Sequence, residues 1–229
     1  MNSSETAFTT VMRRIEHAAA QQNTVGRLPA VSLLAVSKKK PADAVRALAA
    51  LGQRAFGENY VQEGVAKRAE LADLALEWHM IGPLQSNKCR DVAEHFDWLQ
   101  TLDRAKLVEP LARWRPAGTA PLNVLVQVNI DDEDSKSGCA PGDVAPLAAV
   151  IAAQPSLALR GLMAIPAPHA DRALRRTAFE RMRALYDALR REHAGVDTLS
   201  MGMSDDFELA IECGATMVRV GSALFGARG

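Results

Sequence analysis

Short apolar segments alternate with segments of helical length along the chain, and this alternation limits the possible folds more than any other feature. The runs VSLLAVS (31–37) and NVLVQVN (123–129) are nearly continuous in apolar residues, which is typical of parallel strands buried on both faces. We predict strands at residues 31–37, 54–57, 78–81, 97–101, 123–129, 159–164, 198–201 and 217–220. We predict helices at residues 3–22, 42–51, 61–73, 86–94, 104–113, 144–154, 173–193 and 207–212.

Eight strands, each except the last followed by a helix, predict a single (β/α)₈ barrel, the TIM barrel, with residues 1–229 as one domain. The competing architecture is an open, doubly wound sheet, whose usual phosphate loop G-x-G-x-x-G follows its first strand. Here the first predicted strand is followed by Lys38, Lys39, Lys40 and Pro41 instead. The sequence therefore favours the barrel, and its 229 residues are a common length for a single α/β barrel domain.

Charge balance and cysteine content narrow the class of protein. Lys plus Arg and Asp plus Glu each number 27, so the formal net charge is zero, which argues against a nucleic-acid-binding protein with a large excess of positive charge. No apolar run approaches the roughly 20 residues of a membrane span, and no signal peptide is visible. The 3 cysteines form no C-x-x-C pair. We therefore expect a soluble, cytoplasmic protein without nucleic-acid or membrane partners.

Metal ligation and histidine catalysis have little support in the sequence. The histidines have no partner set of cysteines or carboxylates at ligand spacing, so we predict no metal site. The acidic run at residues 131–134 could hold a hard cation, although a solvated loop is the more common meaning of such a run. We expect His79, within a predicted strand, to be buried and bonded to the backbone rather than to act as a base.

A barrel of this type carries its active site at the C-terminal ends of its strands. Lys38 follows the first predicted strand, beside two further lysines. A partly desolvated lysine next to other cations has a lowered pKa and can act as an amine nucleophile. A solvated basic turn explains the same residues, and charge alone favours that interpretation.

Two glycine- and serine-rich segments follow the seventh and eighth predicted strands, SMGMS (200–204) and VGS (220–222). Their N–H groups and hydroxyls would occupy the usual phosphate position of barrels, and Ser204 or Asp205 could cap the following helix. The alternative is that the glycines only permit tight turns. A lysine and a phosphate cradle in one barrel mouth suggest an aldehyde phosphate, either pyridoxal 5′-phosphate (PLP) or the substrate of a Schiff-base aldolase.

Seven segments, in order along nearly the whole chain, resemble the family of PLP homeostasis proteins, the YggS/PROSC family. They are AVSK (35–38), FGENYVQE (56–63), WHMIGPLQSNK (78–88), DSKSG (134–138), GLMAIP (161–166), LSMGMSDD (199–206) and VRVGSALFG (218–226). Any one of them would be weak evidence, but together they are specific. The resemblance implies the fold of the barrel domain of bacterial alanine racemases, without their second, β-rich domain.

The resemblance also implies a cofactor site. The implied PLP-binding residues are Lys38, Asn59, Met163, Ser200, Gly202, Met203, Ser204, Arg219, Gly221 and Ser222. Lys38 would form the Schiff base, Arg219 would face the pyridine nitrogen, and Asn59 would lie near the ring. Met163 would pack against the ring. Ser204, Gly221 and Ser222 would bind the phosphate, assisted by Ser200, Gly202 and Met203.

The implied function is to bind PLP, buffer it and deliver it to PLP-dependent apo-enzymes, as a monomer and without clear catalysis, so we predict no catalytic residues. A permanent cation at Arg219 disfavours protonation of the pyridine nitrogen and makes the ring a poorer electron sink. Alanine racemases share such an arginine, but they add a tyrosine from their second domain as an opposing base. Here Tyr60 lies near the expected rim, and Tyr186 is expected in the core. The alternatives are a PLP-dependent amino-acid racemase or lyase and, third, a Schiff-base aldolase.

Overall fold

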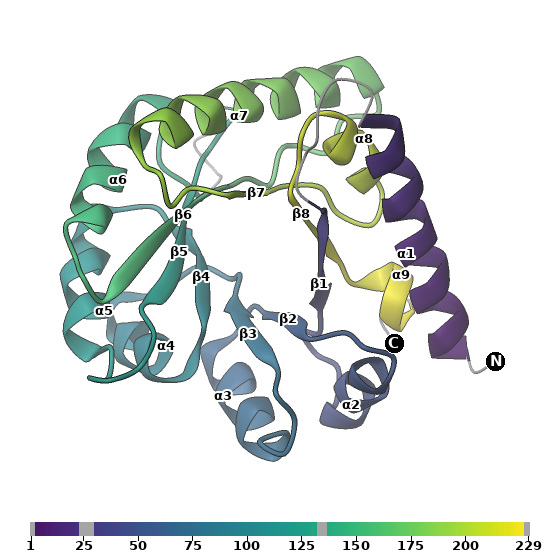
Figure 1. Cartoon of the computed structure of the whole chain (residues 1–229), viewed down its shortest axis with the longest axis horizontal. Helices are drawn as coiled ribbons and strands as arrows, with labels where there is room; N and C mark the ends of the chain where they lie inside the picture. Colours follow the sequence, from purple (N-terminus) through teal and green to yellow (C-terminus); the bar gives the residue numbers. More distant parts are fainter. Residues whose placement is uncertain (1–2, 23–29, 132–136, 227–229) are drawn as a thin grey trace.

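The computed structural model describes residues 3–22, 30–131 and 137–226, and within them eight parallel strands form a closed barrel (Figure 1). The strands are β1 (Ser32–Val36), β2 (Ala55–Glu58), β3 (Glu77–Met80), β4 (Trp98–Leu102), β5 (Leu122–Gln127), β6 (Leu157–Met163), β7 (Thr198–Ser200) and β8 (Met217–Val220). Each strand pairs with the next, and β8 closes the ring by pairing with β1. The predicted barrel is confirmed, because every predicted strand is present in its predicted order.

Helices surround the barrel, and the predicted ones are all found (Figure 1). They are α1 (Ser3–Gln22), α2 (Ala42–Ala50), α3 (Val61–Glu70), α4 (Cys89–His95), α5 (Val108–Trp114), α6 (Val144–Ala152), α7 (Arg172–Glu192), α8 (Phe207–Glu212) and α9 (Ser222–Phe225). Short 3₁₀ turns at Ser86–Lys88, Ala105–Leu107 and Pro141–Asp143 lead into α4, α5 and α6. The helix α9 was not predicted, because four residues are too few to show a helical period.

The long helix α7 shows how the outer ring is held. It begins where the Asp171 carboxylate accepts a hydrogen bond from the Ala173 N–H at 2.7 Å, a side-chain cap of the kind that starts helices. Its apolar residues recur at helical spacing and face the strands, and Phe179 and Met182 are fully buried. Tyr186 is buried on the same face, and burial raises the pKa of its phenol. Its predicted place in the core is confirmed.

The strands have two different faces. Outward-facing side chains such as Leu33 and Ala35 join the large core between strands and helices. Inward-facing side chains form two smaller clusters, one of Leu34, Ile81 and Met217 and one of Trp98, Leu125 and Met163. The barrel interior also holds the fully buried polar side chains of His79, Gln100 and Ser200. Since a buried polar group costs free energy unless it is hydrogen-bonded, the barrel must supply partners for each of them.

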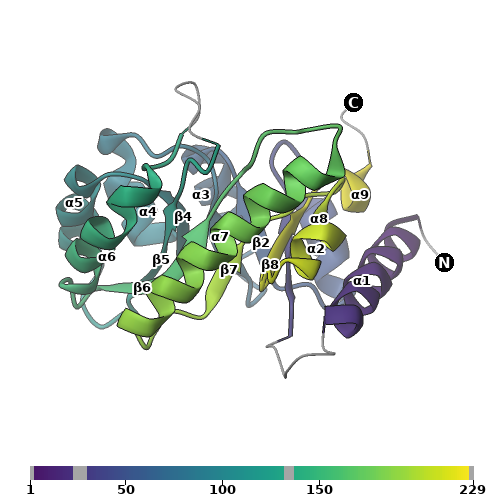
Figure 2. The same ribbon diagram turned by 90° about the horizontal axis from the view of Figure 1, so that it is seen from above.

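The first helix, α1, packs across α8 and α9 on the outside of the barrel (Figures 1 and 2). Val11 and Ile15 are buried in this contact. The Arg14 Nε atom lies 2.6 Å from Glu208 Oε1, and the guanidinium lies 4.5 Å from the centre of the Phe207 ring. α1 thus holds α8 and α9, which follow β7 and β8, in place against the barrel. None of the described helices has the length and apolar character needed to cross a membrane.

Candidate functional site

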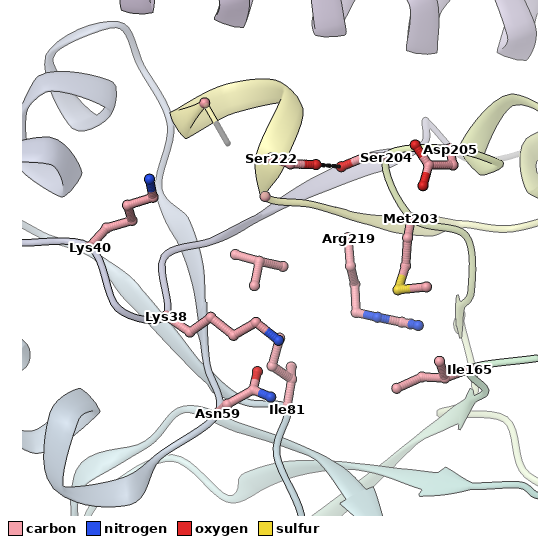
Figure 3. Close-up of a pocket in the computed structure, with 13 residues that line it drawn as sticks. Lys38, Lys40, Asn59, Ile81, Ile165, Met203, Ser204, Asp205, Arg219 and Ser222 are labelled. Atoms are coloured by element: carbon pink, nitrogen blue, oxygen red, sulfur yellow. Dashed lines mark hydrogen bonds between the residues drawn. The ribbon is translucent and has the colours of Figure 1, made fainter. Parts of the chain in front are cut away.

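A cavity of about 300 Å³ opens at the C-terminal ends of the strands (Figure 3). Its lining includes most of the predicted site residues, namely Lys38, Asn59, Met203, Ser204, Arg219, Gly221 and Ser222. These residues lie on or directly after β1, β2, β7 and β8, which are neighbours around the closed barrel. Pairing of β1 with β8 therefore brings together side chains from distant parts of the sequence.

A tight turn after β1 presents Lys38, whose side chain extends into the cavity (Figure 3). The Lys40 N–H donates to the Ser37 carbonyl at 3.0 Å and closes the turn. Lys39 has a φ of +60°, a left-handed conformation that costs free energy in a residue with a side chain. The Lys39 N–H donates to Glu63 Oε1 at 2.5 Å, so α3 holds the turn in this conformation.

A buried ammonium group lies behind this turn. Lys67 Nζ donates to the Ser37 carbonyl, to Glu58 Oε1 and to Glu63 Oε1, each at 2.7 Å, which uses its three N–H donors. The Ser37 hydroxyl also donates to Glu58 Oε1, at 2.6 Å. Burial raises the pKa of the Glu58 carboxyl, and hydrogen bonds from Lys67 and Ser37 offset part of that rise. The network thus holds Ser37, the residue after β1, by its carbonyl and its hydroxyl, and thereby fixes the backbone position of the adjacent Lys38.

The loops after β7 and β8 meet at a pair of hydroxyls. Ser222 Oγ donates to Ser204 Oγ at 3.1 Å (Figure 3), and Gly221 precedes the first residue of α9. The prediction that Ser204 or Asp205 caps the helix after β7 is wrong, because α8 begins after Asp206 and no side chain caps it. The Asp206 carboxylate instead accepts from the Met203 N–H at 2.7 Å and closes the loop on itself.

Gly202 allows the β7 loop to lie flat against α8. Its φ is +92°, and an added Cβ atom would lie 2.5 Å from the Ala210 Cβ atom. Its carbonyl accepts a hydrogen bond from the Arg219 N–H at 3.0 Å, which joins the loop to β8. Both its conformation and the contact with α8 require glycine at this position.

Arg219 brings a buried guanidinium to the wall of the cavity (Figure 3). One terminal nitrogen donates to the Ser200 carbonyl at 2.9 Å and to the Ser200 hydroxyl at 2.8 Å. The other donates to the Ala164 carbonyl at 2.8 Å. Burial lowers the pKa of Arg219 to about 10, so the group remains a cation at neutral pH.

The other predicted site residues lie outside the cavity lining. Ser200 is fully buried behind Arg219, and Gly202 lies in the loop described above. Met163 is fully buried in the cluster with Trp98 and Leu125, because the end of β6 turns its side chain into the barrel.

Lys67 and Glu63 were not among the predicted site residues. Their spacing of four residues on a helix is usually the mark of a surface ion pair, and only the fold shows that this one is buried against Glu58.

Two further predictions concern histidine and metal. The predicted burial of His79 is confirmed, but its partners are the side chains of Glu77 and Gln100 rather than the backbone. Among the described residues, no three histidine, cysteine or acidic side chains gather in a group that could hold a metal ion. Most of the acidic run at 131–134 lies outside the described residues, as do residues 134–136 of the DSKSG segment.

Comparisons with known proteins agree with this geometry. The family model of the alanine racemase N-terminal domain matches residues 13–229. The pyridoxal phosphate homeostasis protein of Pseudomonas aeruginosa is 58% identical over 95% of this chain and 93% of its own length. The protein of that name from Escherichia coli K12 is 53% identical, over 89% and 88%.

Solved structures show the same fold. PipY of Synechococcus elongatus with PLP bound superposes with a TM-score of 0.78 at 38% identity, covering 93% of this chain and all of that one. An alanine racemase of Clostridium difficile, at 14% identity and a TM-score of 0.71, shares the fold over 94% of this chain and 56% of its own. The chain therefore belongs to the family of pyridoxal phosphate homeostasis proteins, which have the barrel fold of the alanine racemase N-terminal domain.

Proposed function

We propose that this protein binds PLP as a Schiff base on Lys38 in the cytoplasm, buffers it, and delivers it to PLP-dependent apo-enzymes without catalysing a reaction of its own. The observation that carries the proposal is that an amine, a pair of hydroxyls and a guanidinium line one cavity at the C-terminal end of the barrel. The names of the relatives and the PLP bound in PipY support the same ligand.

The residues of the cavity fit PLP in size and in chemistry. A volume of about 300 Å³ suits a small ligand. Ser204 and Ser222, with the backbone of Gly221, offer donors for a phosphate where the two loops meet. Lys38 offers an amine for the aldehyde. When bound, PLP supplies an aldehyde and a ring that can accept electrons.

Arg219 sets the electronic character of the site. Its guanidinium stays charged at neutral pH, and a cation beside a ring nitrogen opposes protonation of that nitrogen. Arg219 would donate a hydrogen bond to that nitrogen, and it would thereby hold the ligand without strengthening the capacity of the ring to accept electrons. This arrangement supports storage of the ligand more than chemistry on it.

The position of the tyrosines supports the same conclusion. A racemase needs two groups that exchange protons on opposite sides of the substrate. Tyr60 is 54% exposed, and Tyr186 is buried on the inner face of α7. Neither belongs to the described lining of the cavity. The titratable side chains of the described cavity wall are Lys38, Lys40, Asp205 and Arg219. An opposing tyrosine of the kind that alanine racemases use is thus absent from this part of the chain.

The test of PLP binding is an absorption spectrum of the purified protein before and after borohydride reduction, followed by fragmentation mass spectrometry. We expect a yellow Schiff-base band that reduction removes, with the pyridoxyl mass on Lys38 rather than on Lys39 or Lys40. Lys40→Met is the matched control, because Lys40 also lines the cavity, and it should keep the band. A colourless protein that does not take up added PLP would contradict the proposal.

Delivery and lack of catalysis need a separate experiment. The PLP-loaded protein should restore activity to a PLP-dependent apo-enzyme, and it should elute as a monomer in size-exclusion chromatography. Incubation with each amino acid should give no sustained turnover. Turnover that Lys38→Met abolishes would instead establish a PLP-dependent racemase or lyase.

A further inference from the structure

A continuous row of hydrogen-bonded side chains runs through the barrel interior and ends at the guanidinium of Arg219. Its members are Glu77 and His79 on β3, Gln100 on β4, Ser200 on β7 and Arg219 on β8. The successive distances, beginning at Glu77, are 2.8, 2.9, 2.7 and 2.8 Å. Glu77 begins β3 at the end of the barrel opposite the cavity and keeps part of its side chain in solvent.

The hydrogen bonds all point in one direction. Arg219 has only donors, so the Ser200 hydroxyl must accept from it and donate its own hydrogen to Gln100 Oε1. The Gln100 amide nitrogen also has only donors, so it donates to His79 Nδ1, and the ring proton is then on Nε2, facing the Glu77 carboxylate. Donation therefore runs from the cavity wall to Glu77 without a reversal.

This row leaves Arg219 with a fixed orientation. Three of its N–H groups donate to Ser200 and Ala164, and the planar guanidinium cannot turn without breaking them. The remaining N–H groups of Arg219 have no protein acceptor among the described residues. Since Arg219 lines the cavity, they are the donors left for a ligand. The interior of a barrel of this type is usually filled by aliphatic side chains, so a polar row that ends on a site residue needs a reason beyond packing.

We propose that Gln100 and His79 are positioning residues, which act through the Ser200 hydroxyl to aim Arg219 at the ring nitrogen of the bound pyridine. The proposal rests on the proposed function, because it assumes that PLP is the ligand. Without an acceptor at Gln100, the Ser200 hydroxyl is free to rotate, and its lone pairs are no longer held toward the Arg219 N–H. Arg219 is then held only by the Ser200 and Ala164 carbonyls, so its orientation is less preorganised and the ligand has to supply part of the free energy of ordering it.

The test compares two ligands on matched variants. The ligands are PLP and its analogue in which a C–H group replaces the ring nitrogen. Gln100→Met removes the acceptor while nearly keeping the shape of the side chain. Gln53→Met is the control, because Gln53 is also a buried glutamine, but it donates to the Leu33 and Ala55 carbonyls away from the row.

We expect Gln100→Met to weaken PLP binding about tenfold and to leave the affinity for the carbon analogue unchanged. Gln53→Met should keep the wild-type affinity for both ligands. Ser200→Ala should lower the affinity for PLP as Gln100→Met does. The double variant should bind PLP with the affinity of the more weakly binding single variant, because both changes break the same connection. Ser200→Ala removes fewer atoms than Gln100→Met changes, and it therefore tests the proposal even if Gln100→Met does not fold.

The outcomes separate this inference from the proposed function. A wild-type protein that takes up no PLP contradicts the proposed function itself. A wild-type protein that binds PLP, together with a Gln100→Met variant that weakens both ligands equally or behaves like Gln53→Met, overturns only the positioning role. If the wild type binds both ligands equally well, Arg219 does not use the ring nitrogen, and the inference is wrong.

Discussion

Lys67 Nζ lies 2.7 Å from Glu58 Oε1 in an ion pair that solvent barely reaches, since the two side chains are 8% and 0% exposed. Such a pair is weak evidence of a net gain in stability, because both charges lose their hydration. Removal of one partner is a different matter, because it leaves the other charge buried without compensation. Two predictions follow from this geometry.

We expect Lys67→Met to lower the free energy of unfolding by about 3–5 kcal/mol, because the Glu58 carboxylate would lose its buried counter-ion. Urea denaturation measures this loss. The double variant Lys67→Met/Glu58→Gln should recover part of it, since no buried charge then remains. Arg46→Met is the control, because it breaks the exposed ion pair with Asp73, and it should change the urea midpoint of unfolding little. A small effect of Lys67→Met would contradict the assigned burial.

The second prediction concerns pH. Burial raises the pKa of Glu58 above its usual value of 4.5, so the native state binds more protons than the unfolded state between that value and the raised one. The contribution of Glu58 to the free energy of unfolding therefore falls as pH rises through this window. Glu58→Gln should remove that fall, so its stability relative to the wild type should increase from about pH 4 to about pH 8. A constant difference across this range would show that the pKa is not raised.

Gly202 and Gly118 form a matched pair for substitution by alanine. Both have positive φ, +92° and +80°, but an added Cβ atom at Gly118 meets no described atom within 4 Å, whereas at Gly202 it meets α8. Gly118→Ala should cost only the strain of the backbone, about 1–2 kcal/mol. Gly202→Ala should cost about 2–5 kcal/mol and weaken PLP binding, because the loop that carries Ser204 has to move. Thermal unfolding and ligand titration measure both effects, and equal losses in the two variants would refute the close packing.

The cysteines should be unreactive in the native protein. All three are buried, and burial raises the pKa of Cys139 and of Cys213 to about 11. At about pH 8 the thiolate fraction of these two is then roughly 0.1%, and the thiolate is the reactive form. We expect a disulfide reagent to modify all three thiols after denaturation and to react slowly before it. Rapid modification of one thiol in the folded protein would contradict its burial.

Most of the fold could be predicted from the sequence because its signals are local. Apolar runs such as residues 123–129 mark strands buried on both faces, and helical periods such as that of α7 mark the outer ring. Most predicted site residues meet in one cavity because the closed barrel brings the strand ends together. Their individual roles toward the ligand remain predictions.

Partners on distant strands could not be predicted, because register around the barrel decides them. His79 and Gln100 are 21 residues apart, and nothing near either residue indicates that they form a hydrogen bond. The same holds for Lys67, whose helical spacing to Glu63 is that of a surface pair, although Lys67 contacts the buried Ser37 carbonyl and Glu63 contacts the Lys39 N–H in the turn after β1. Met163 lies outside the cavity wall for a related reason, since the end of β6 turns it toward Trp98.

The pairing of β1 with β8 has a consequence for biosynthesis. Lys38 follows the first strand and Ser222 follows the last, so a growing polypeptide emerging from the ribosome carries the amine long before it carries the hydroxyls. Under the proposed function, a nascent or truncated chain that lacks the segment after β8 would offer PLP the amine of Lys38 but not the hydroxyl of Ser222. Ligand binding then stabilises only the completed barrel, by mass action.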